Sequence, residues 1–287
     1  MARRLHWNAS ANALCHLPAR AIVRLNVQRL LRLGKRVNVR GWLVVVLVAL
    51  LAEVAIQLFE LHDSVSPPSE TLPALGEGIS SGELLGALRT TLEAYLGGLA
   101  LAIVVGVLFG VLIGSSRLLL DASFVVLEFL RPIPAVALIP LAFLFFGTGT
   151  EMRRYIVAYA AVWPILVNTL YGVRGSDRIL HEVALASGVS RLGRLVRVTL
   201  PAALPSIATG IRVSASIGLL VAVTAEFFFG SAGIGAYMHR QQLAFQLPEM
   251  YAAVLLTALL GYTVNVALRL TERRVIHWSG EERFRWP

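Results

Sequence analysis

Charged residues are scarce in this sequence. Asp, Glu, Lys and Arg make up 15% of its 287 residues, against about 25% in an ordinary soluble domain. Hydrophobic residues make up 56% of the chain, and the mean hydropathy is +0.71. A water-soluble chain of this length needs a polar surface that so few charged side chains do not supply. The composition therefore predicts a membrane protein.

Cysteine and lysine are almost absent, and this excludes several kinds of chemistry. A single cysteine, Cys15, excludes an internal disulfide and a cysteine-based metal cluster. A phosphate-binding P-loop reads G-x-x-x-x-G-K-S/T. The only lysine is Lys35, and Arg29 and Arg36 stand where that loop needs glycine and Ser or Thr. The six histidines never lie three or four residues apart, so we expect no catalytic residue, no metal site and no cofactor on this chain.

Apolar segments long enough to cross a bilayer recur along the chain. A helix needs roughly 20 apolar residues, rising about 1.5 Å each, to cross a hydrocarbon core of about 30 Å. Six segments meet that length: residues 42–60, 92–114, 122–146, 155–173, 207–229 and 250–268. The third is interrupted by the sequence RPIP at 131–134. The sequence thus predicts an all-α polytopic membrane protein with about six transmembrane helices.

The second of these segments contains closely spaced small residues, in the sequence GGLALAIVVGVLFGVLIG at 97–114. In lipid, small residues let two helix backbones approach each other. For any single glycine of the segment, a position in a plain lipid-facing helix is equally expected.

Basic residues are distributed asymmetrically. The first 40 residues contain nine Lys and Arg and no acid, whereas the loop at 61–83 contains four acids and no Lys or Arg. Basic residues concentrate on the cytoplasmic side of membrane proteins, so six spans place both termini in the cytoplasm. Of the 26 Lys and Arg residues, 20 then lie inside. This asymmetry accounts for the net charge of +9 without a nucleic acid, and predicts a multi-pass protein of the plasma (inner) membrane.

We expect four segments along the chain. Residues 1–41 form a basic cytoplasmic segment, which is too long in its charged part for a signal peptide. Residues 42–83 hold the first span and an acidic external loop. Residues 84–272 form the membrane core, with a cytoplasmic loop at 174–206, and residues 273–287 form a cytoplasmic tail.

The cytoplasmic loop contains the sequence HEVALASGVSRLGRLVRVTLP at 181–201. Its second half places apolar and basic side chains on opposite faces of a helix, and a shorter helix precedes it. Gly188 separates the two helices because glycine adopts the positive φ of a sharp turn. Pro201 disfavours helix at Leu200, so we expect the second helix to end there. On pattern alone, this helix pair either contacts another protein or lies flat on anionic lipid.

The spacing within this loop resembles the EAA loop of the membrane subunits of ABC importers. The similarity rests on Glu182, Ala184, a glycine six residues after the glutamate, and Leu200-Pro201; Val183 stands where alanine is usual. Three further segments, RPIPAVALIPLAFLFFGTG at 131–149, WPILVNTLYGVR at 163–174 and AEFFFGSAGIGAYM at 225–238, resemble the nitrate, sulfonate and taurine branch of these permeases. The similarity covers roughly residues 84–276.

This resemblance implies a function and a set of partners. It implies the type I ABC importer permease fold, with the loop helices docked on a separate ATPase subunit that binds ATP and Mg. It also implies a second permease chain, expected as a homodimer, two ATP-binding subunits and an external substrate-binding protein. The expected coupling residues are Glu182, Ala184, Gly188, Arg191, Arg194, Arg197, Leu200 and Pro201. The three arginines either pair with acids of the ATPase or face water and lipid headgroups.

Polar residues in or near the spans are candidates for the translocation pathway or its gate. Arg131 precedes Pro132 and Pro134, which break the helix, so it either meets an anionic substrate or pairs with Glu128. Glu226 lies near the outer end of its span, where it caps helices or helps gate. Arg212 lies 14 residues before it, about 21 Å by helical rise, too far to pair within one straight helix.

Two other function classes fit the sequence less well than a permease. An intramembrane metalloprotease needs an HExxH pair, but Val183, Ala184 and Leu185 follow His181-Glu182. A membrane scaffold or signalling protein leaves the loop motif unexplained. The sequence does not identify the solute, and the resemblance alone favours a small anion similar to nitrate, sulfonates or taurine.

Overall fold

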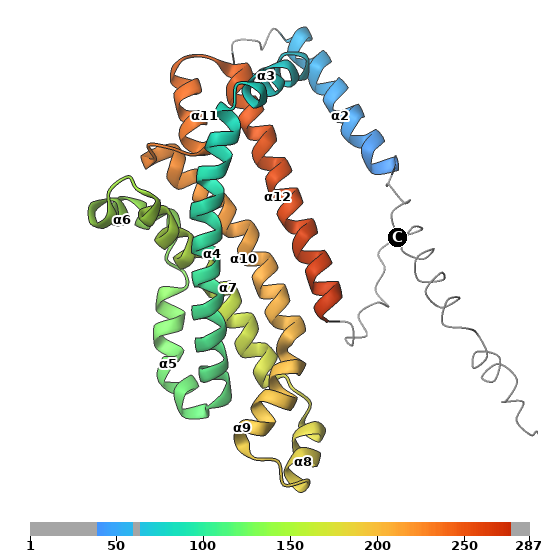
Figure 1. Ribbon diagram of the computed structural model, residues 1–287, viewed down its shortest axis with the longest axis vertical. Coiled ribbons are helices and arrows are strands. Elements are labelled where there is room, and N and C mark those ends of the chain that lie inside the picture. Colours follow the sequence, from blue (N-terminus) through green and yellow to red (C-terminus); the bar gives the residue numbers. More distant parts are fainter. Residues whose placement is uncertain (1–38, 60–63, 277–287) are drawn as a thin grey trace, which may run out of the picture. The chain divides into compact units, whose positions relative to one another are not determined.

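The computed structural model describes residues 39–59 and 64–276, and every regular element in those two ranges is a helix (Figure 1). The predicted all-α class is therefore confirmed. The chain divides into two compact units at residue 60, and each is described by itself.

The first unit contains α2 (Val39–Leu58), a helix of 20 residues. At about 1.5 Å per residue it is about 30 Å long, which matches the thickness of a hydrocarbon core. Its apolar part, Leu43–Leu58, falls within the predicted first span at 42–60. The basic segment predicted to precede it lies almost entirely outside the described residues.

The second unit consists of helices of very different lengths. In chain order they are α3 (Pro68–Ser80), α4 (Glu83–Ser115), α5 (Arg117–Leu130), η2 (Ala135–Leu138), α6 (Ile139–Phe146), α7 (Thr150–Arg174), α8 (Arg178–Ala186), α9 (Arg191–Arg194), η3 (Leu195–Thr199), α10 (Leu200–Phe229), α11 (Ile234–Leu243) and α12 (Leu247–Val275). The element η2 is a 3₁₀-helix and η3 is a π-helical turn.

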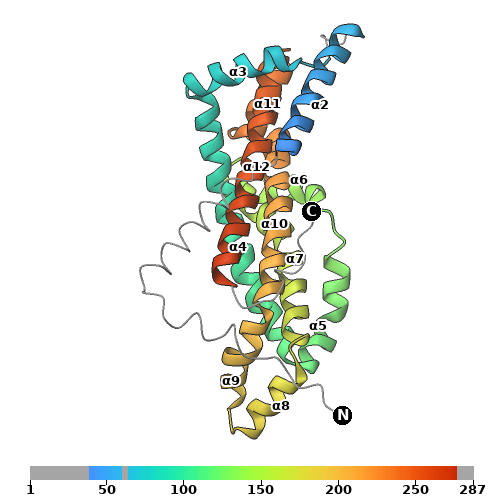
Figure 2. The ribbon, with the colours of Figure 1, turned by 90° about the vertical axis from the view of Figure 1, so that its right-hand side faces the viewer.

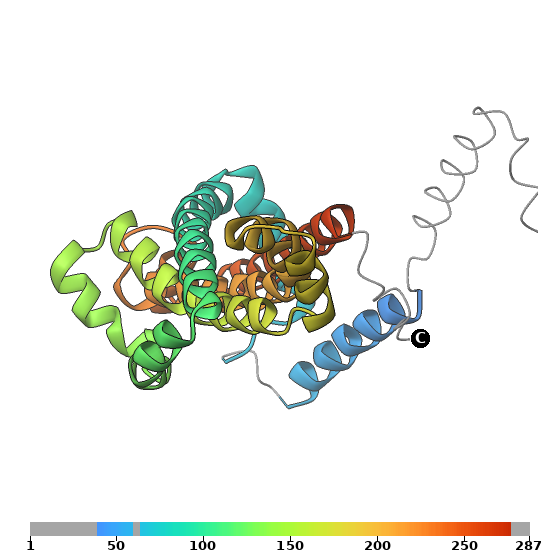
Figure 3. The same ribbon diagram turned by 90° about the horizontal axis from the view of Figure 1, so that it is seen from below.

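Four helical runs of this unit are long and apolar enough to cross a membrane. They are α4, α7, the continuous run Arg191–Phe229 and α12. They contain the spans predicted at 92–114, 155–173, 207–229 and 250–268. The helices lie side by side along one direction, with α3 and α11 at one end and α8 and α9 at the other (Figures 1 and 2). Figure 3 looks along the bundle from the end that carries α8 and α9.

The span predicted at 122–146 is a bent pair instead of a straight rod. Helix α5 and the run Ala135–Phe146 meet at an angle of 78°, at the RPIP sequence. Pro132 and Pro134 have no N–H to donate, so an α-helix does not continue through them. The Leu130 carbonyl at the break accepts hydrogen bonds from the Ile133 N–H at 3.3 Å and the Tyr159 hydroxyl at 2.9 Å. The break is therefore held in place by α7.

A stripe of small residues brings α4 against α7. It consists of every fourth residue of α4, namely Gly98, Ala102, Gly106, Gly110 and Gly114, of which all but Gly114 are buried. A Cβ atom added at any of the four glycines would lie 2.6–3.0 Å from an atom of α7. The two backbones thus approach as closely as glycine allows, so at these positions the structure shows the close-contact alternative and not the lipid-facing one.

Two hydrogen bonds join the neighbouring helices near the middle of the bundle. The Tyr95 hydroxyl of α4 donates to the Ala215 carbonyl of α10 at 3.0 Å. The Ser214 hydroxyl of α10 donates to the Ala161 carbonyl of α7 at 2.6 Å. Both pairs are buried, so α4, α7 and α10 form one rigid core.

The small-residue stripe predicts that Gly110→Ala destabilises the protein. The new Cβ would lie 2.6 Å from the Thr169 Cβ and 2.9 Å from the Leu166 carbonyl oxygen, and a backbone atom in a packed helix cannot move aside. Overpacking of this kind costs about 1–3 kcal/mol. The control is Gly86→Ala in the same helix, because its Cβ would meet nothing within 4 Å and gains up to about 1 kcal/mol of helix propensity. Thermal unfolding in detergent should give a lower Tm for the first variant only; equal Tm values would contradict the close contact.

Candidate functional site

Two groups of residues, at opposite ends of the bundle, have the geometry of functional sites. The first is the inner helix pair, which we define as α8, the turn Ser187–Ser190, α9 and η3. A side chain caps the N-terminus of each of its α-helices. Asp177 accepts a hydrogen bond from the Ile179 N–H at 2.8 Å, and Ser190 accepts one from the Gly193 N–H at 3.2 Å. Such N-caps fix where each helix begins.

The turn between the two helices is a Schellman motif. Gly188 has φ +73°, its N–H donates to the Leu185 carbonyl at 3.0 Å, and the Val189 N–H donates to the Ala184 carbonyl at 3.0 Å. The positive φ predicted for Gly188 is confirmed. A Cβ at this glycine would meet nothing within 4 Å, so the turn projects away from the rest of the described chain. Ala184, in contrast, is buried.

The inner helix pair exposes an apolar surface. The run Arg191–Phe229 has 39 residues, about 58 Å at 1.5 Å per residue, so its first part extends beyond a hydrocarbon core of about 30 Å. Six apolar side chains of the pair are 50–70% exposed: Ile179, Leu180, Val183, Leu185, Leu192 and Val196. Exposed apolar side chains on such a helix pair are typical of a contact with another protein or with lipid.

The inner helix pair also contains an ion pair and three basic residues. The Glu182 carboxylate accepts a hydrogen bond from the Arg178 guanidinium at 2.9 Å. Arg191 and Arg197 are exposed and Arg194 is half-buried. These three arginines have no ion-pair partner among the described residues, so their contact with a partner or with lipid headgroups stays a prediction.

His181 ties the two halves of the pair together. Its Nε2 lies 2.8 Å from the Ser176 hydroxyl and 3.4 Å from the Thr199 hydroxyl, so α8 is linked to η3. From the sequence, His181 was expected to matter only as part of a protease motif, which is absent. Its position on the same helix face as the buried Ala184 was the signal that it points toward its own chain.

The predicted end of the second loop helix at Leu200 and Pro201 is wrong. The helix runs without interruption from Arg191 to Phe229, and Pro201 stands in the first turn of α10. The π-turn η3 directly precedes it, with the Leu200 N–H donating to the Leu195 carbonyl. This wider turn accommodates the proline ring, which would otherwise clash with a carbonyl of the preceding turn. The inner helix pair is therefore continuous with a membrane span.

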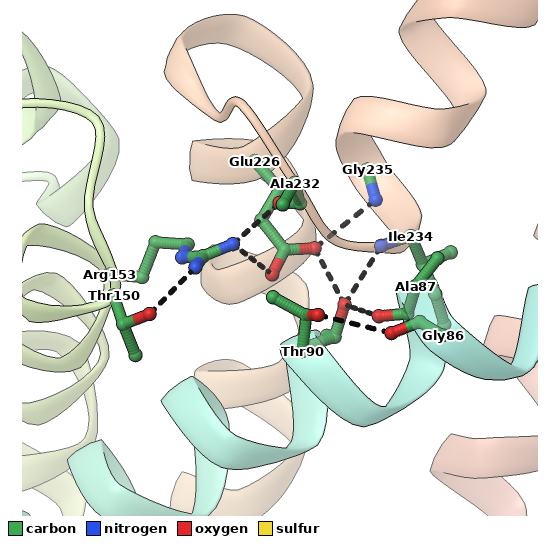
Figure 4. A network of polar contacts seen from close by, with 10 residues as sticks. Gly86, Ala87, Thr90, Thr150, Arg153, Glu226, Ala232, Ile234 and Gly235 are labelled. Atoms are coloured by element: carbon green, nitrogen blue, oxygen red, sulfur yellow. Dashed lines mark hydrogen bonds and ion pairs between the residues drawn. The ribbon is translucent and has the colours of Figure 1, made fainter.

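The second group, which we call the outer network, is a buried polar network at the other end of the bundle (Figure 4). It joins Thr91 of α4, Arg153 of α7 and Glu226 of α10, whose exposed fractions are 0%, 2% and 0%. The Glu226 carboxylate accepts hydrogen bonds from the Arg153 guanidinium at 3.3 Å, the Thr91 hydroxyl at 2.8 Å and the Gly235 N–H at 3.2 Å. Buried charges of this kind persist only when paired.

The same network holds the loop between α10 and α11. The Arg153 guanidinium donates to the Ala232 carbonyl at 2.5 Å and to the Thr150 hydroxyl at 3.0 Å. The Ile234 N–H, in the first turn of α11, donates to the Thr91 hydroxyl at 2.8 Å. Glu226 and Thr91 thus satisfy N–H groups that a helix start leaves unpaired, and the carboxylate lies at the positive end of the helix dipole.

Glycine is required where this loop passes the carboxylate. Gly233 has φ +108°, and a Cβ there would collide with the Glu226 carboxylate. A Cβ at Gly235 would collide with the Val223 carbonyl. The GSAGIG sequence at 230–235 is therefore a tight turn around a buried acid.

Glu226 lies near the predicted outer end of its span and caps α11, while its role as a gate stays a prediction. Its partner Arg153 was not predicted from the sequence. Its position in the first turn of a span, at the end with few basic residues, was the available signal for a buried acidic partner.

Arg131, Pro132 and Pro134 lie at the bend between α5 and η2. Arg131 is exposed, and among the described residues it has no ion-pair partner, so the alternative pairing with Glu128 is not formed. Helix α5 has no buried residue in the described chain. The bend thus presents a guanidinium on a face that this chain does not cover, and its contact with a solute stays a prediction.

Comparisons with known proteins extend over both sites. Residues 102–277 match the family model described as binding-protein-dependent transport system inner membrane component. That range contains the inner helix pair. It also contains Arg153 and Glu226 of the outer network, while Thr91 lies before it.

Three relatives illustrate the range of names in this group. SsuC of Bacillus subtilis, named as an aliphatic sulfonates transport permease protein, is 35% identical over 205 residues, covering 70% of this chain and 73% of its own. The nitrate import permease protein NrtB of Leptolyngbya laminosa is 28% identical, with coverage of 70% and 72%. The riboflavin transport system permease protein RibX of Chloroflexus aurantiacus is 34% identical, with coverage of 74% and 80%.

A solved structure has the same fold. A chain of the inward-facing MetNI methionine ABC transporter superimposes with a TM-score of 0.60 at 19% sequence identity, covering 67% of this chain and 95% of that chain. At this identity the likeness concerns the fold alone.

The outer network predicts that Arg153→Met destabilises the protein strongly. The change leaves the Glu226 carboxylate buried without a counter-charge, which costs about 3–5 kcal/mol. The double variant Arg153→Met, Glu226→Gln should have a higher Tm than Arg153→Met alone. The neutral amide removes the unpaired charge and keeps an oxygen that accepts from the Gly235 N–H.

The matched control is Arg89→Met, which breaks the ion pair with Glu93 at 2.9 Å. Both of those side chains are more than half exposed, so we expect a change of at most about 1 kcal/mol. Thermal unfolding of the four proteins in detergent compares them. Similar Tm losses for Arg153→Met and Arg89→Met would contradict the structural role of the buried pair.

Proposed function

Because the chain belongs to the binding-protein-dependent transport system inner membrane component family, we propose that it forms half of the translocation pathway of an ATP-driven importer for small anions. Membership makes the chain a permease subunit of an ABC importer and a multi-pass protein of the inner membrane. It is not an enzyme, since ATP is hydrolysed on a separate subunit. The fold is that of the type I importer permeases, as predicted.

One observation carries the proposed coupling role, namely the exposed apolar surface of the inner helix pair. Its Schellman turn projects from the described chain with open space around Gly188. A rigid, apolar projection of this kind fits a groove on another protein, and the arginines beside it suit acidic groups at the rim of that groove. We assign the groove to an ATP-binding subunit, which holds the ATP and Mg.

The proposed assembly contains two copies of this chain and two ATP-binding subunits. Support for a second copy comes from the bent segment of α5, η2 and α6, whose large apolar side chains are extensively exposed. Phe124, Val125, Phe129, Leu144 and Phe145 are each at least 59% exposed. A closed symmetric dimer would cover such a face on both copies with the same contacts.

A pocket at the predicted outer end suits the external binding protein. It has a volume of about 400 Å³ and is lined by the start of α4, the loop at 231–233 and α11. Arg240 lines it, with its guanidinium 5.9 Å from the centre of the Tyr237 ring. Ala232, which lines the same pocket, accepts the hydrogen bond of Arg153. A protein that docks here therefore contacts a loop tied directly to the outer network.

The proposed solute is a small anion similar to a sulfonate or nitrate. The names of SsuC and NrtB support this choice, and RibX, named for riboflavin, supplies the alternative to be tested. Arg131 supports this choice on the chain itself. It lies at the bend between α5 and η2 and has no ion-pair partner among the described residues. A charged side chain at that depth is expected to face an aqueous cavity or a ligand.

The coupling role predicts that Gly188→Arg abolishes solute uptake without unfolding the protein. A side chain at this φ adds about 1–2 kcal/mol of backbone strain but meets no atom of the described chain, so the loss should arise at the docking surface. ATP-driven uptake into proteoliposomes and co-purification of the ATP-binding subunit measure it. The control is Ser115→Arg, which adds the same charge at an exposed position at the inner end of α4. Normal uptake and normal association of the Gly188→Arg variant would overturn the docking role.

The solute assignment predicts a selective defect for Arg131→Met. Losing a hydrogen bond to a charged group costs about 1.5–3 kcal/mol, roughly a tenfold to hundredfold loss of affinity. Uptake of ethanesulfonate, taurine, nitrate and riboflavin by the complete importer, at solute concentrations below saturation, provides the measurement, with Arg89→Met as the control on the outer surface. Uptake of riboflavin alone, or an unchanged rate for Arg131→Met, would contradict the assignment.

A further inference from the structure

A polar cluster joins the inner halves of α10 and α12 within the membrane. The Arg212 guanidinium of α10 forms an ion pair with the Glu272 carboxylate of α12. Asn265 lies two helical turns before Glu272, and both helices are membrane spans. The two fully buried residues of α12 are Ala252 and Ala253, near its other end. The polar cluster therefore joins the inner half of α12 to α10, beside Leu260, Val264 and Leu268, which pack against the hydrophobic core.

Two atoms of this cluster lack hydrogen-bond partners. The Nε of Arg212 and the Oδ1 of Asn265 are buried, and neither finds a partner among the described residues. The first is a donor and the second is an acceptor. A buried polar atom left unsatisfied costs about 1–3 kcal/mol, so this pair needs an explanation.

Both residues line one small cavity between the helices. Ser216 and Gly261 also line it, and the space open to the centre of a water molecule is about 10 Å³. A buried water needs about 10–15 Å³ of such space and two to four polar partners. The cavity thus has room for one water molecule and no larger ligand.

We propose that this cavity binds a single water molecule that bridges α10 and α12. The water accepts a hydrogen bond from the Arg212 N–H and donates one to the Asn265 oxygen, so both unsatisfied atoms gain a partner. The guanidinium is then held on one side by Glu272 and on the other by the water. This arrangement explains why an amide and an arginine face the same small space inside a membrane segment.

Gly261 keeps the space open for the water. A Cβ added there would lie 3.3 Å from the Leu219 Cδ2, the end of a flexible side chain that lines the same cavity. The substitution Gly261→Ala therefore fits the helix once the Leu219 side chain moves aside, and it adds a methyl group to the cavity lining. It changes none of the polar partners themselves.

The Tm of Gly261→Ala is the first measurement. Replacing glycine by alanine inside a helix ordinarily stabilises the helix, but here the Leu219 side chain must also move aside, so the Tm is read together with the map described below. If the water is displaced, the Tm should fall by about 2–4 °C, the shift that a net loss of about 1 kcal/mol produces in a chain of this size. Gly86→Ala, which has open space around it, should raise the Tm in either case.

A cryo-EM map of the wild-type chain in a lipid nanodisc, at a resolution that shows ordered water, provides the second measurement. We expect a density peak about 2.7–3.2 Å from both the Arg212 Nε and the Asn265 Oδ1, and no peak in the Gly261→Ala variant. A raised Tm for Gly261→Ala, or a wild-type map with an empty cavity or with direct contact between the two side chains, would overturn the proposal.

Discussion

The close contact of α4 with α7 is the constraint on which the rest of the structure depends. Lipid offers helices no hydrophobic gain on pairing, so their association depends on packing and on polar contacts. The four glycines of the stripe leave no room for a Cβ, and this fixes the register of the two helices. The same register places Thr91 of α4 beside the network of Arg153 at one end of α7. At the other end, α7 leads directly into the inner helix pair.

The run Arg191–Phe229 is one continuous helix that joins the two candidate sites. Its first part, α9 and η3, belongs to the inner helix pair, and Glu226 stands in its last turn. The inner helix pair is therefore continuous with a helix whose carboxylate holds the start of α11. The π-turn η3 lies where this helix leaves the loop. Single π-turns within helices often occur at functional sites. The ion pair between Arg212 and Glu272 joins α12 to the same helix.

Much of this arrangement follows from the sequence, because it depends on local rules. The length of the apolar segments predicted the spans. Gly188 predicted the turn in the loop, and the RPIP sequence predicted the break in the third span. The rest depends on contacts between distant residues. Arg153 and Glu226 pair although they lie 73 residues apart, and no sequence pattern near either residue indicates the other. The continuation of the helix through Pro201 was not predicted. A proline ends an α-helix because its ring clashes with the carbonyl four residues earlier, and the wider π-turn before Pro201 avoids this clash.

The central claim is that the inner helix pair docks on an ATP-binding subunit. The most direct test is site-specific photo-cross-linking in native membranes, with the reactive side chain at Leu185 on the exposed face of α8 and, for comparison, at Leu259 of α12, which is 47% exposed on a membrane span. The account predicts a cross-link from position 185 to the ATP-binding subunit and none from position 259. A cross-link from position 185 to lipid alone, or to an external protein, would contradict it.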